Sequence, residues 1–415
     1  MARGHAARVG WPTRVPSAAR PAPDQPSAAT MTDTARIDLA SAARLIVVKV
    51  GTRVLTGPDG LLDTARIDAL GRQFDAALAA GRRIVLVSSG AVGAGMGRMG
   101  LASRPQELAS LQAVAAIGQS CLIEAYERAF RARGRHAAQV LLVAEDLQDR
   151  SRYLNIRNTL RALLDFGAIP VINENDTVSV EELRTSFGDN DRLAALVATL
   201  LGAPLLLLLS DVDGLYDRHP GEPGAAVLAH VPRIDAAVEG LARDRLGGLS
   251  KGGMASKIAA ARIVTEAGGS CIIASGRDDH VLDEVCRGAT VGTLFTSRGA
   301  TMPAWKRWLG WSADPRGSIV VDSGAREAVV DGGRSLLAAG VVAVEGDFAA
   351  GDVVALSAGG GRPFARGLVN YPAAELRRIA GLKTDRIAAV LGSVPYEEVI
   401  HRDNLAIISR EDAAC

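Results

Sequence analysis

Short apolar runs alternate with longer segments of helical periodicity between residue 45 and about residue 295. The intervening segments, such as 64–80 and 105–133, carry apolar residues at the spacing of an amphipathic helix. Strands and helices in alternation predict βαβ units, and so an α/β domain with an open, mainly parallel sheet sandwiched by helices. The six apolar runs are LIVVKVG, RIVLVSSG, QVLLVAED, AIPVINEND, PLLLLLSDVDG and SCIIASG.

Polar residues stand at the ends of four of these predicted strands, in the segments 49–52, 88–90, 173–176 and 210–211. A turn would explain any one of these endings. In a parallel sheet, however, the carboxyl ends of the strands share one edge, and ligands bind beyond that edge. Four polar endings together therefore favour a binding site there.

The chain changes character after residue 295. Three tryptophans, Trp305, Trp308 and Trp311, indicate a packed linker. Short runs of strand-forming residues follow, punctuated by glycine and aspartate, with one helix-like stretch at 325–330. They predict a small β-rich domain. The predicted boundaries are 1–43 for a disordered or non-native N-terminal extension, 44–295 for the α/β domain, 296–313 for the linker, 314–402 for the β-rich domain and 403–415 for a C-terminal tail.

Composition narrows the class of protein. The formal net charge of +1 argues against a general nucleic-acid or membrane binder. The four cysteines are scattered without a CxxC pair, as expected for a reduced cytosolic protein. No apolar run reaches the roughly 18 residues that cross a bilayer.

The N-terminal segment has an unusual composition. The first 30 residues contain four arginines, one acid and five prolines, and they lack the apolar stretch of a signal peptide. We therefore expect them to be disordered. Either Met31 is the true start of the protein, or the preceding residues form a basic targeting segment.

Two lysines are candidates for binding phosphate. Lys49 lies inside an apolar strand, where an ammonium group loses hydration unless it reaches an anion or water. It is either a phosphate-binding lysine or a strand-end lysine whose ammonium group reaches solvent. Lys257 ends the sequence KGGMASK, whose glycines lead into a predicted helix with free N–H groups for a phosphate. The alternative for this segment is a helix cap and a linker.

Other motifs are less specific. GMGRMG, at 95–100, matches the dinucleotide fingerprint, but its first glycine comes several residues after the strand, and a flexible glycine-rich loop is the alternative. In GDNDRL, either Asp189 or Asn190 caps a helix, which leaves Asp191 for another role. The acids of SDVDG lack the spacing of a calcium loop, and the histidines show no metal-ligand spacing, so we expect no built-in metal site.

Six motifs, taken in order and at their spacings, resemble those of the glutamate 5-kinases of the amino acid kinase superfamily. The resemblance covers about residues 44–402 and ends in what looks like a PUA domain, an RNA-binding-type module with a small β-rich barrel. It implies the amino acid kinase fold and ATP-dependent phosphorylation of the γ-carboxylate of L-glutamate, the first step of proline biosynthesis. The motifs are VVKVGTRVL, VSSGAVGAG, PVINENDTV, GDNDRLAALVA, LLLLSDVDGLY and GGMASK.

The resemblance also implies roles for individual residues. The implied catalytic residues are two lysines near the transferred phosphoryl group and the acid that orients them: Lys49, Lys257 and Asp191. The implied glutamate-binding residues are Ser89, Asn190 and Asp176, the last of which would hold the α-amino group. The implied ATP-binding residues are Lys49, Ser210, Asp211, Lys251, Gly252, Gly253, Met254, Ala255, Ser256 and Lys257. Mg²⁺ would arrive with ATP, without a metal site of the protein's own.

Two positions depart from the family pattern. The ATP loop usually reads Gly-Thr-Gly-Gly-Met, whereas this chain has Ser250 and Lys251 before Gly252. Ser250 restricts the backbone if that position needs a positive φ, and Lys251 either adds a phosphate contact or repels a neighbouring lysine. Arg53 stands where a small polar residue is more typical.

Three other functions compete with glutamate phosphorylation. A kinase for N-acetylglutamate, aspartate or carbamate is the nearest, although the acidic NEND segment favours a substrate with a free ammonium group. An RNA-binding protein would use the β-rich domain, but residues 314–400 hold nine Lys and Arg against eleven Asp and Glu, so the basic footprint is missing. A Rossmann dehydrogenase rests on residues 95–100 alone.

The family resemblance bears on partners as well. It implies a cytoplasmic homo-oligomer, dimeric or tetrameric, that proline inhibits at a site overlapping the glutamate site.

Overall fold

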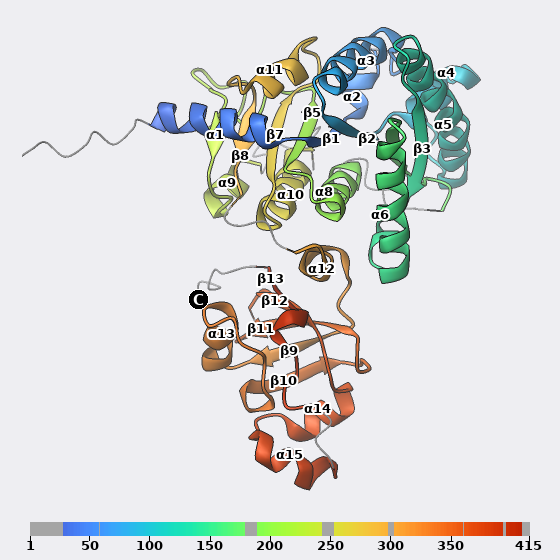
Figure 1. Cartoon of the computed structure of the whole chain (residues 1–415). Coiled ribbons are helices and arrows are strands. Elements are labelled where there is room, and N and C mark those ends of the chain that lie inside the picture. The colour runs from blue at the N-terminus through green and yellow to red at the C-terminus, as the bar shows by residue number, and fades with distance from the viewer. Residues whose placement is uncertain are drawn as a thin grey trace, which may run out of the picture.

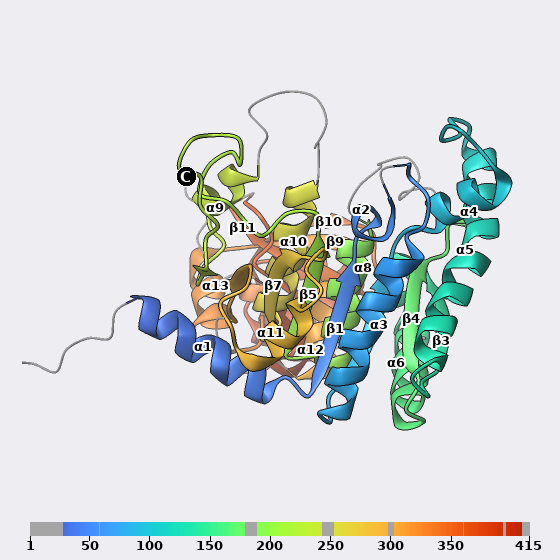
Figure 2. The ribbon, with the colours of Figure 1, turned by 90° about the horizontal axis from the view of Figure 1, so that it is seen from above.

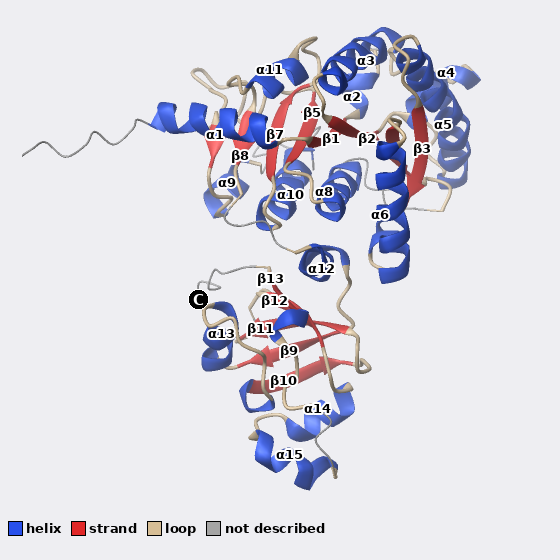
Figure 3. Cartoon of the chain, viewed as in Figure 1, coloured by secondary structure: helices blue, strands red, loops and turns tan. Residues whose placement is uncertain are grey.

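The chain forms two sheets, one of eight strands and one of five, in separate parts of the molecule (Figure 1). Helices surround both sheets (Figure 3). The computed structural model describes residues 28–57, 59–178, 189–242, 253–297, 303–359, 361–392 and 396–408.

The larger sheet contains all six strands that the apolar runs predict. In order across the sheet, its strands are β3 (Ala137–Leu142), β4 (Ile169–Glu174), β2 (Arg83–Ser88), β1 (Leu45–Val50), β5 (Leu205–Ser210), β7 (Ser270–Ser275), β8 (Thr293–Phe295) and β6 (His230–Val231). The six predicted strands run parallel, so the prediction of a mainly parallel sheet is confirmed. β8 pairs antiparallel with β7, and both β8 and β6 are too short to show a periodicity in the sequence.

Helices cover both faces of this sheet, as the alternating pattern predicts (Figure 1). One face is covered by α3 (Thr64–Ala79), α5 (Leu108–Arg131) and α11 (Val281–Arg287), and the other by α6 (Arg150–Asp165), α8 (Asp189–Leu201) and α10 (Gly253–Glu266). Successive side chains of a strand point to opposite faces. In β1, Val48 joins the core under α3 and α5, whereas Val47 joins the core under α8 and α10. Lys49 therefore points to the α8 and α10 face.

Short helices begin directly after β1 and β2, at the carboxyl edge of the sheet (Figure 2). They are α2 (Thr52–Leu55) and α4 (Ala91–Met99). Gly90, at the turn from β2 into α4, has a φ of 102°, which residues with a side chain rarely adopt. Two further short helices of this domain are η1 (Ala144–Leu147) and α9 (Ala236–Leu241).

The GMGRMG segment lies in α4 and its C-cap, so the prediction of a glycine-rich loop there is wrong. Its glycines allow close packing of helices. A Cβ atom on Gly95 would lie 1.9 Å from the carbonyl oxygen of Val114, and one on Gly118 would lie 1.8 Å from that of Ala91. The backbones of α4 and α5 therefore touch where they cross, and the spacing that resembles a dinucleotide fingerprint serves this contact.

α5 is long and apolar enough to cross a membrane, with a mean hydropathy of 1.3 over an 18-residue window, and it is the one such helix among the described residues. Its buried residues include Leu122, Tyr126 and Phe130, which belong to the core it shares with α3. Its other side meets α4 at Gly118. One side of α5 is thus packed on the core of the domain, and 39% of the apolar window is buried.

A helix precedes β1 at the N-terminal end. The structure thus differs from the expected disorder over the last part of residues 1–43, because residues 28–42 form α1 (Ala28–Ala42). Arg36 is 2% exposed, and its guanidinium group donates to the carbonyl oxygens of Ala229, Val291 and Gly292 at 2.7, 2.8 and 2.9 Å. These partners lie 193 to 256 residues away along the chain, so composition could not reveal them.

Four strands of the second sheet lie in the region predicted to be β-rich, 314–402, whereas the fifth, at 405–407, lies in the predicted C-terminal tail, so that boundary is wrong. Across this sheet its strands are β10 (Val341–Gly346), β9 (Gly317–Val321), β11 (Val353–Ala358), β12 (Ala365–Leu368) and β13 (Leu405–Ile407). The accompanying helices are α13 (Ser323–Val330), η3 (Ala338–Gly340), α14 (Ala373–Ile379), α15 (Thr384–Leu391) and η4 (Arg402–Asn404). The helix-like stretch at 325–330 lies in α13, whereas the pattern did not reveal α14 and α15.

The segment between the two parts is packed, through α12 (Ala304–Arg307) and the π-helical turn η2 (Trp308–Ser312). Trp308 is 5% exposed, and its ring centroid lies 6.3 Å from that of Tyr153 on α6. The Arg307 Nε donates to the Thr199 carbonyl at 2.8 Å. The linker is thus part of the core beneath α6 and α8.

Candidate active site

The carboxyl edge of the larger sheet borders a cavity of about 1050 Å³. Lys49, Ser89 and Ser210, from the ends of β1, β2 and β5, line this cavity. Asn173, at the end of β4, lies behind Asn190, which lines the cavity and donates a hydrogen bond to it. The structure therefore brings together the four polar strand endings that the sequence singles out.

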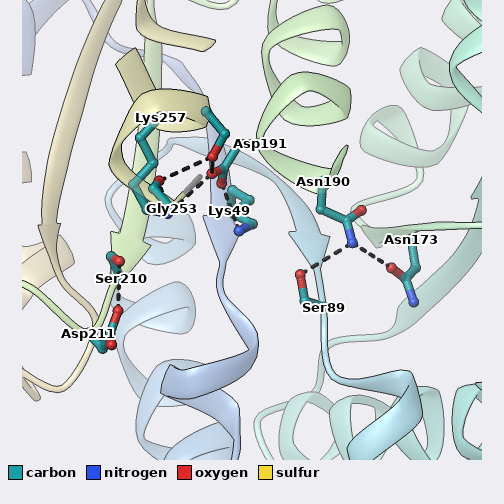
Figure 4. A network of polar contacts seen from close by, with 10 residues as sticks. Lys49, Ser89, Asn173, Asn190, Asp191, Ser210, Asp211, Gly253 and Lys257 are labelled. Atoms are coloured by element: carbon teal, nitrogen blue, oxygen red, sulfur yellow. Dashed lines mark hydrogen bonds and ion pairs between the residues drawn. The ribbon is translucent and has the colours of Figure 1, made fainter. Parts of the chain in front are cut away.

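Lys49, Asp191 and Lys257 form a charged cluster in this cavity (Figure 4). The Lys49 Nζ lies 2.7 Å from the Asp191 Oδ1, and the Lys257 Nζ lies 3.2 Å from the Asp191 Oδ2. Lys49 comes from β1, Asp191 from the first turn of α8, and Lys257 from the second turn of α10. They meet because Lys49 points to the face that α8 and α10 cover.

Burial shapes the electrostatics of the cluster. Asp191 is 1% exposed, and Lys49 and Lys257 are 7% and 8% exposed. Burial by itself would raise the pKa of Asp191, but the two ammonium groups hold that pKa below its usual value. Burial lowers the pKa of Lys257, and the adjacent carboxylate opposes that effect. Two ammonium groups and one carboxylate leave an excess positive charge facing the cavity, which suits an anion.

Ser256 supports the same carboxylate. Its hydroxyl donates to the Asp191 Oδ2 at 2.8 Å and lies 3.1 Å from the Gly253 carbonyl oxygen. The Lys257 Nζ also donates to that carbonyl, at 3.1 Å. The first turn of α10 therefore holds both Asp191 and the ammonium group of Lys257.

A chain of buried polar groups lies on the other side of the cavity (Figure 4). The Asn190 Nδ2 donates to the Ser89 Oγ and to the Asn173 Oδ1, both at 3.2 Å. The Asn173 Nδ2 donates to the Gln119 Oε1 at 2.7 Å. Neither Asn173 nor Gln119 is among the site residues that the family resemblance implies. Asn173 has a visible signal as a polar strand ending, whereas Gln119 is one of several polar residues of α5 and carries no such signal.

Ser210 and Asp211 line the cavity at the end of β5. The Ser210 hydroxyl donates to the Asp211 Oδ1 at 3.1 Å, and the Arg53 Nη1 donates to the Asp211 Oδ2 at 3.0 Å. Burial would raise the pKa of Asp211, but these contacts and the Arg53 charge hold it below its usual value. Arg53, the residue that departs from the family pattern, thus pairs with an expected nucleotide-binding acid.

The remaining expected site residues differ in their positions. Gly253 and Met254 line the cavity, while Ala255 is exposed on α10. Asp176 is 8% exposed in the turn after β4 and does not line the cavity. Lys251 and Gly252 lie outside the described residues.

The far part of the cavity is lined by residues to which the sequence assigns no role, within 212–222 and at the end of α9 within 237–242. Residues 212–216 end the motif LLLLSDVDGLY, but the others carry no motif, so only the fold shows that they face the cavity. Within the described ranges, no group of three or more His, Cys, Asp or Glu side chains could hold a metal ion.

The fold and this cavity have counterparts among known proteins. Residues 44–275 match the Amino acid kinase family, and residues 317–391 match the PUA domain. The first match spans more than half of the chain, so the chain belongs to the amino acid kinase family.

The similar proteins narrow this class to the glutamate 5-kinases. The chain is 49% identical over 364 residues to Glutamate 5-kinase of Rhodopirellula baltica, covering 88% of this chain and 94% of that one. It is 50% identical over 367 residues to Glutamate 5-kinase of Myxococcus xanthus, covering 88% and 97%. For Glutamate 5-kinase of Moorella thermoacetica, the identity is 47% over 369 residues, covering 89% and 97%. At this identity and coverage the chain is a member of the same family.

Proposed function

We propose that the chain catalyses the ATP-dependent phosphorylation of the γ-carboxylate of L-glutamate to L-glutamyl 5-phosphate, the first step of proline biosynthesis. The relatives are named Glutamate 5-kinase, and the chain matches them over almost their whole length. The observation that carries the proposal is the buried Lys49–Asp191–Lys257 cluster, since two ammonium groups held on one carboxylate suit the charge of a phosphoryl group in transfer.

The cavity divides into two proposed subsites. Glutamate would lie against Ser89 and Asn190, with its α-amino group held by Asp176. ATP would extend past Ser210 and Asp211 towards the loop before α10. Lys49 and Lys257 lie between these two ends of the cavity, where the γ-phosphate would meet the acceptor carboxylate (Figure 4).

This chemistry needs few reacting groups from the protein. A carboxylate oxygen is already a nucleophile, so no general base is required. The enzyme has to align two anions and neutralise the charge that spreads over the phosphoryl oxygens. Asp191, whose pKa is lowered, remains ionised at neutral pH and so keeps both lysines oriented.

Mg²⁺ fits the residues that line the cavity. Asp211 offers one carboxylate, which also pairs with Arg53, and the ion is commonly held by one or two carboxylates, substrate phosphates and water. Asp211 would hold it together with ATP. Once bound, the ion would neutralise charge on the phosphate oxygens.

The cell compartment and the assembly belong to the same proposal. A cytoplasmic enzyme that forms a dimer or tetramer and is inhibited by proline is what the family resemblance implies. Sedimentation velocity with and without proline, and turnover at rising proline concentrations, test both points.

Hydroxylamine trapping tests the proposed reaction directly. Purified enzyme is incubated with ATP, Mg²⁺ and hydroxylamine, and with L-glutamate, L-aspartate or N-acetyl-L-glutamate as the acceptor. Hydroxamate from L-glutamate alone is the expected result, because an acyl phosphate reacts with hydroxylamine. Hydroxamate from one of the other acids alone would assign the chain to a different acceptor. No hydroxamate from folded enzyme with any of the three would contradict the proposed kinase activity.

A further inference from the structure

Gln119 lies outside the cavity lining but is joined to it through Asn173 and Asn190. It is 8% exposed on α5, and its Oε1 accepts a hydrogen bond from the Asn173 Nδ2 at 2.7 Å. Asn173 is 1% exposed, and its Oδ1 accepts from the Asn190 Nδ2 at 3.2 Å. Asn190 in turn donates to the Ser89 Oγ. Three buried amides thus connect α5 to a hydroxyl group in the cavity.

A backbone contact sets the direction of these hydrogen bonds. The Glu174 N–H, which can only donate, donates to the Asn173 Oδ1 at 2.9 Å. The Asn173 Nδ2 is therefore the end of the amide that faces Gln119, and it needs a hydrogen-bond acceptor there. The Gln119 Oε1 is this acceptor, so it stabilises the single orientation of Asn173 in which the Oδ1 receives Asn190.

The same logic extends to Ser89. The Asn190 Nδ2 donates both to the Asn173 Oδ1 and to the Ser89 Oγ. Because its Oγ accepts from Asn190, the hydroxyl proton of Ser89 is left to donate elsewhere, and Ser89 lines the cavity. The hydroxyl thus presents a donor to a bound molecule, and a carboxylate is an acceptor-only group that matches it.

We propose that Gln119 is a positioning residue, which acts through Asn173 and Asn190 to direct the Ser89 hydroxyl as a donor to a carboxylate of the acceptor substrate. This inference rests on the proposed function, because it assumes that the acceptor binds beside Ser89. The Gln119 side chain sets the affinity for the acceptor without touching it and leaves ATP binding unaffected.

Gln119→Met tests this role. Methionine has a similar length and apolar volume but offers no comparable acceptor, so the Asn173 amide loses its partner. The Gln119 Nε2 has no hydrogen-bond partner within the described ranges, so the substitution removes one hydrogen bond only. We expect the KM for the acceptor to rise about tenfold, as for a buried donor left unsatisfied. The KM for ATP should stay within about twofold, since that subsite keeps its contacts.

Gln73→Met is the matched control. Gln73 is 2% exposed on α3, its Oε1 accepts from the Leu282 N–H at 2.9 Å, its Nε2 donates to the Asp278 carbonyl at 3.4 Å, and it does not line the cavity. This variant should lose at least as much thermal stability as Gln119→Met while both KM values stay unchanged. Equal changes of acceptor KM in both variants would show a merely structural role and overturn the proposal.

A double-mutant cycle with Ser89→Ala separates this pathway from a direct effect. If Gln119 acts through Ser89, Gln119→Met should raise the acceptor KM by only about twofold in the Ser89→Ala background. Additive effects would overturn the proposal. All measurements use whichever of the three acceptors the unsubstituted enzyme phosphorylates. An error in the glutamate assignment therefore appears with the unsubstituted enzyme, before any variant is measured. If it phosphorylates none, unchanged binding of all three acids to Gln119→Met by calorimetry would overturn the inference.

Discussion

At the scale of single residues, Asp191 organises the candidate site. Its two carboxylate oxygens bind different lysines, at 2.7 and 3.2 Å, and a third contact comes from the Ser256 hydroxyl. The ammonium groups are therefore oriented before a substrate enters. A preorganised charge stabilises a transition state without the cost of reorganisation at the moment of reaction.

Lys257→Ala should reduce turnover far more than it reduces substrate affinity. We expect kcat to fall by about 100- to 1000-fold, the loss typical when one preorganised electrostatic group is removed. Glutamate binding, measured by calorimetry, should be retained, and Lys49→Ala should behave in the same way. Lys306→Ala is the control, because Lys306 lies in the linker, where its Nζ donates to the Arg402 carbonyl of η4, and it does not line the cavity. Turnover like that of the unsubstituted enzyme in Lys257→Ala would exclude the lysine from the chemistry.

The pH dependence of turnover should report the same lysine. Burial lowers the pKa of Lys257 from the ordinary lysine value of 10.5, so its ammonium group loses its proton at a lower pH than an exposed lysine does. Below the lowered pKa the group is charged and active, and above it the group is neutral. We expect kcat to fall on the alkaline side before pH 10.5, and Lys257→Arg to shift that fall to higher pH if it retains turnover, because arginine stays charged. If kcat falls over the same alkaline pH range in the unsubstituted enzyme and in Lys257→Arg, the fall reports a group other than Lys257.

Asp176→Ala tests the proposed contact with the α-amino group of glutamate. The proposed contact with the α-amino group is a charge-assisted hydrogen bond, and we expect glutamate affinity to fall by about 10- to 100-fold on its loss. Nucleotide affinity should be unchanged, since Asp176 follows β4 and the proposed nucleotide subsite follows β5. Calorimetric titrations with glutamate and with ATP measure both quantities. Unchanged glutamate affinity would refute the role.

At the scale of elements, the crossing of α4 and α5 supports the site from behind. α4 begins two residues after Ser89, and α5 carries both Gly118 and Gln119. The close approach at Gly118 sets the distance between these helices. An error in that distance would displace Ser89 and Gln119 relative to each other.

Gly118→Ala should destabilise the protein. The added Cβ would lie 1.8 Å from the Ala91 carbonyl oxygen and 2.3 Å from the Gly95 nitrogen, so the two backbones must separate. We expect a cost of about 1–3 kcal/mol or more in the free energy of unfolding, measured by chemical denaturation, and a raised acceptor KM. Gly324→Ala, in α13, is the control, because its Cβ would meet only the Asp322 carboxylate, at 3.5 Å. Equal stability of the two variants would contradict the close approach.

At the scale of the whole molecule, the linker belongs to the larger domain's core. Trp308 and Leu309 are buried with Tyr153 of α6 and Leu200 of α8 in one cluster. The smaller sheet adjoins this cluster, to which its Val353 and Ala406 belong, and the Arg366 Nη1 donates to the Ala313 carbonyl at 2.7 Å. The β-rich domain thus follows, along the chain, linker residues that belong to the core of the larger domain.

Two truncated chains should therefore differ. A chain that ends at residue 313 keeps Trp308 and Leu309, and we expect it to fold and to phosphorylate the acceptor. A chain that ends at residue 297 exposes the surface that these residues cover, and it should melt several degrees lower or aggregate, as for loss of a large buried side chain. Thermal unfolding and hydroxamate assays measure the difference. Equal melting temperatures would show that the linker is not part of that core.

Much of the fold could be predicted because its signals are local. Six strands and the helices between them follow from periodicities that a window of a few residues contains, and the order of the six motifs identifies the family. The misses have a common cause. β6 and β8 are too short for a period, and the glycines of 95–100 serve a contact with α5 that the local sequence does not contain.

The sequence by itself determined the alternation of strands and helices, the edge at which polar residues gather, and the family to which the chain belongs. Only the tertiary structure decided that one carboxylate, Asp191, lies between two lysines. It also decided that Arg36 of α1 donates to carbonyl groups at least 193 residues away, and that Gln119 accepts a hydrogen bond from Asn173. Residue types and periods are properties of short segments. Distances between side chains depend on how helices pack across the sheet, and that packing is set by the whole core at once.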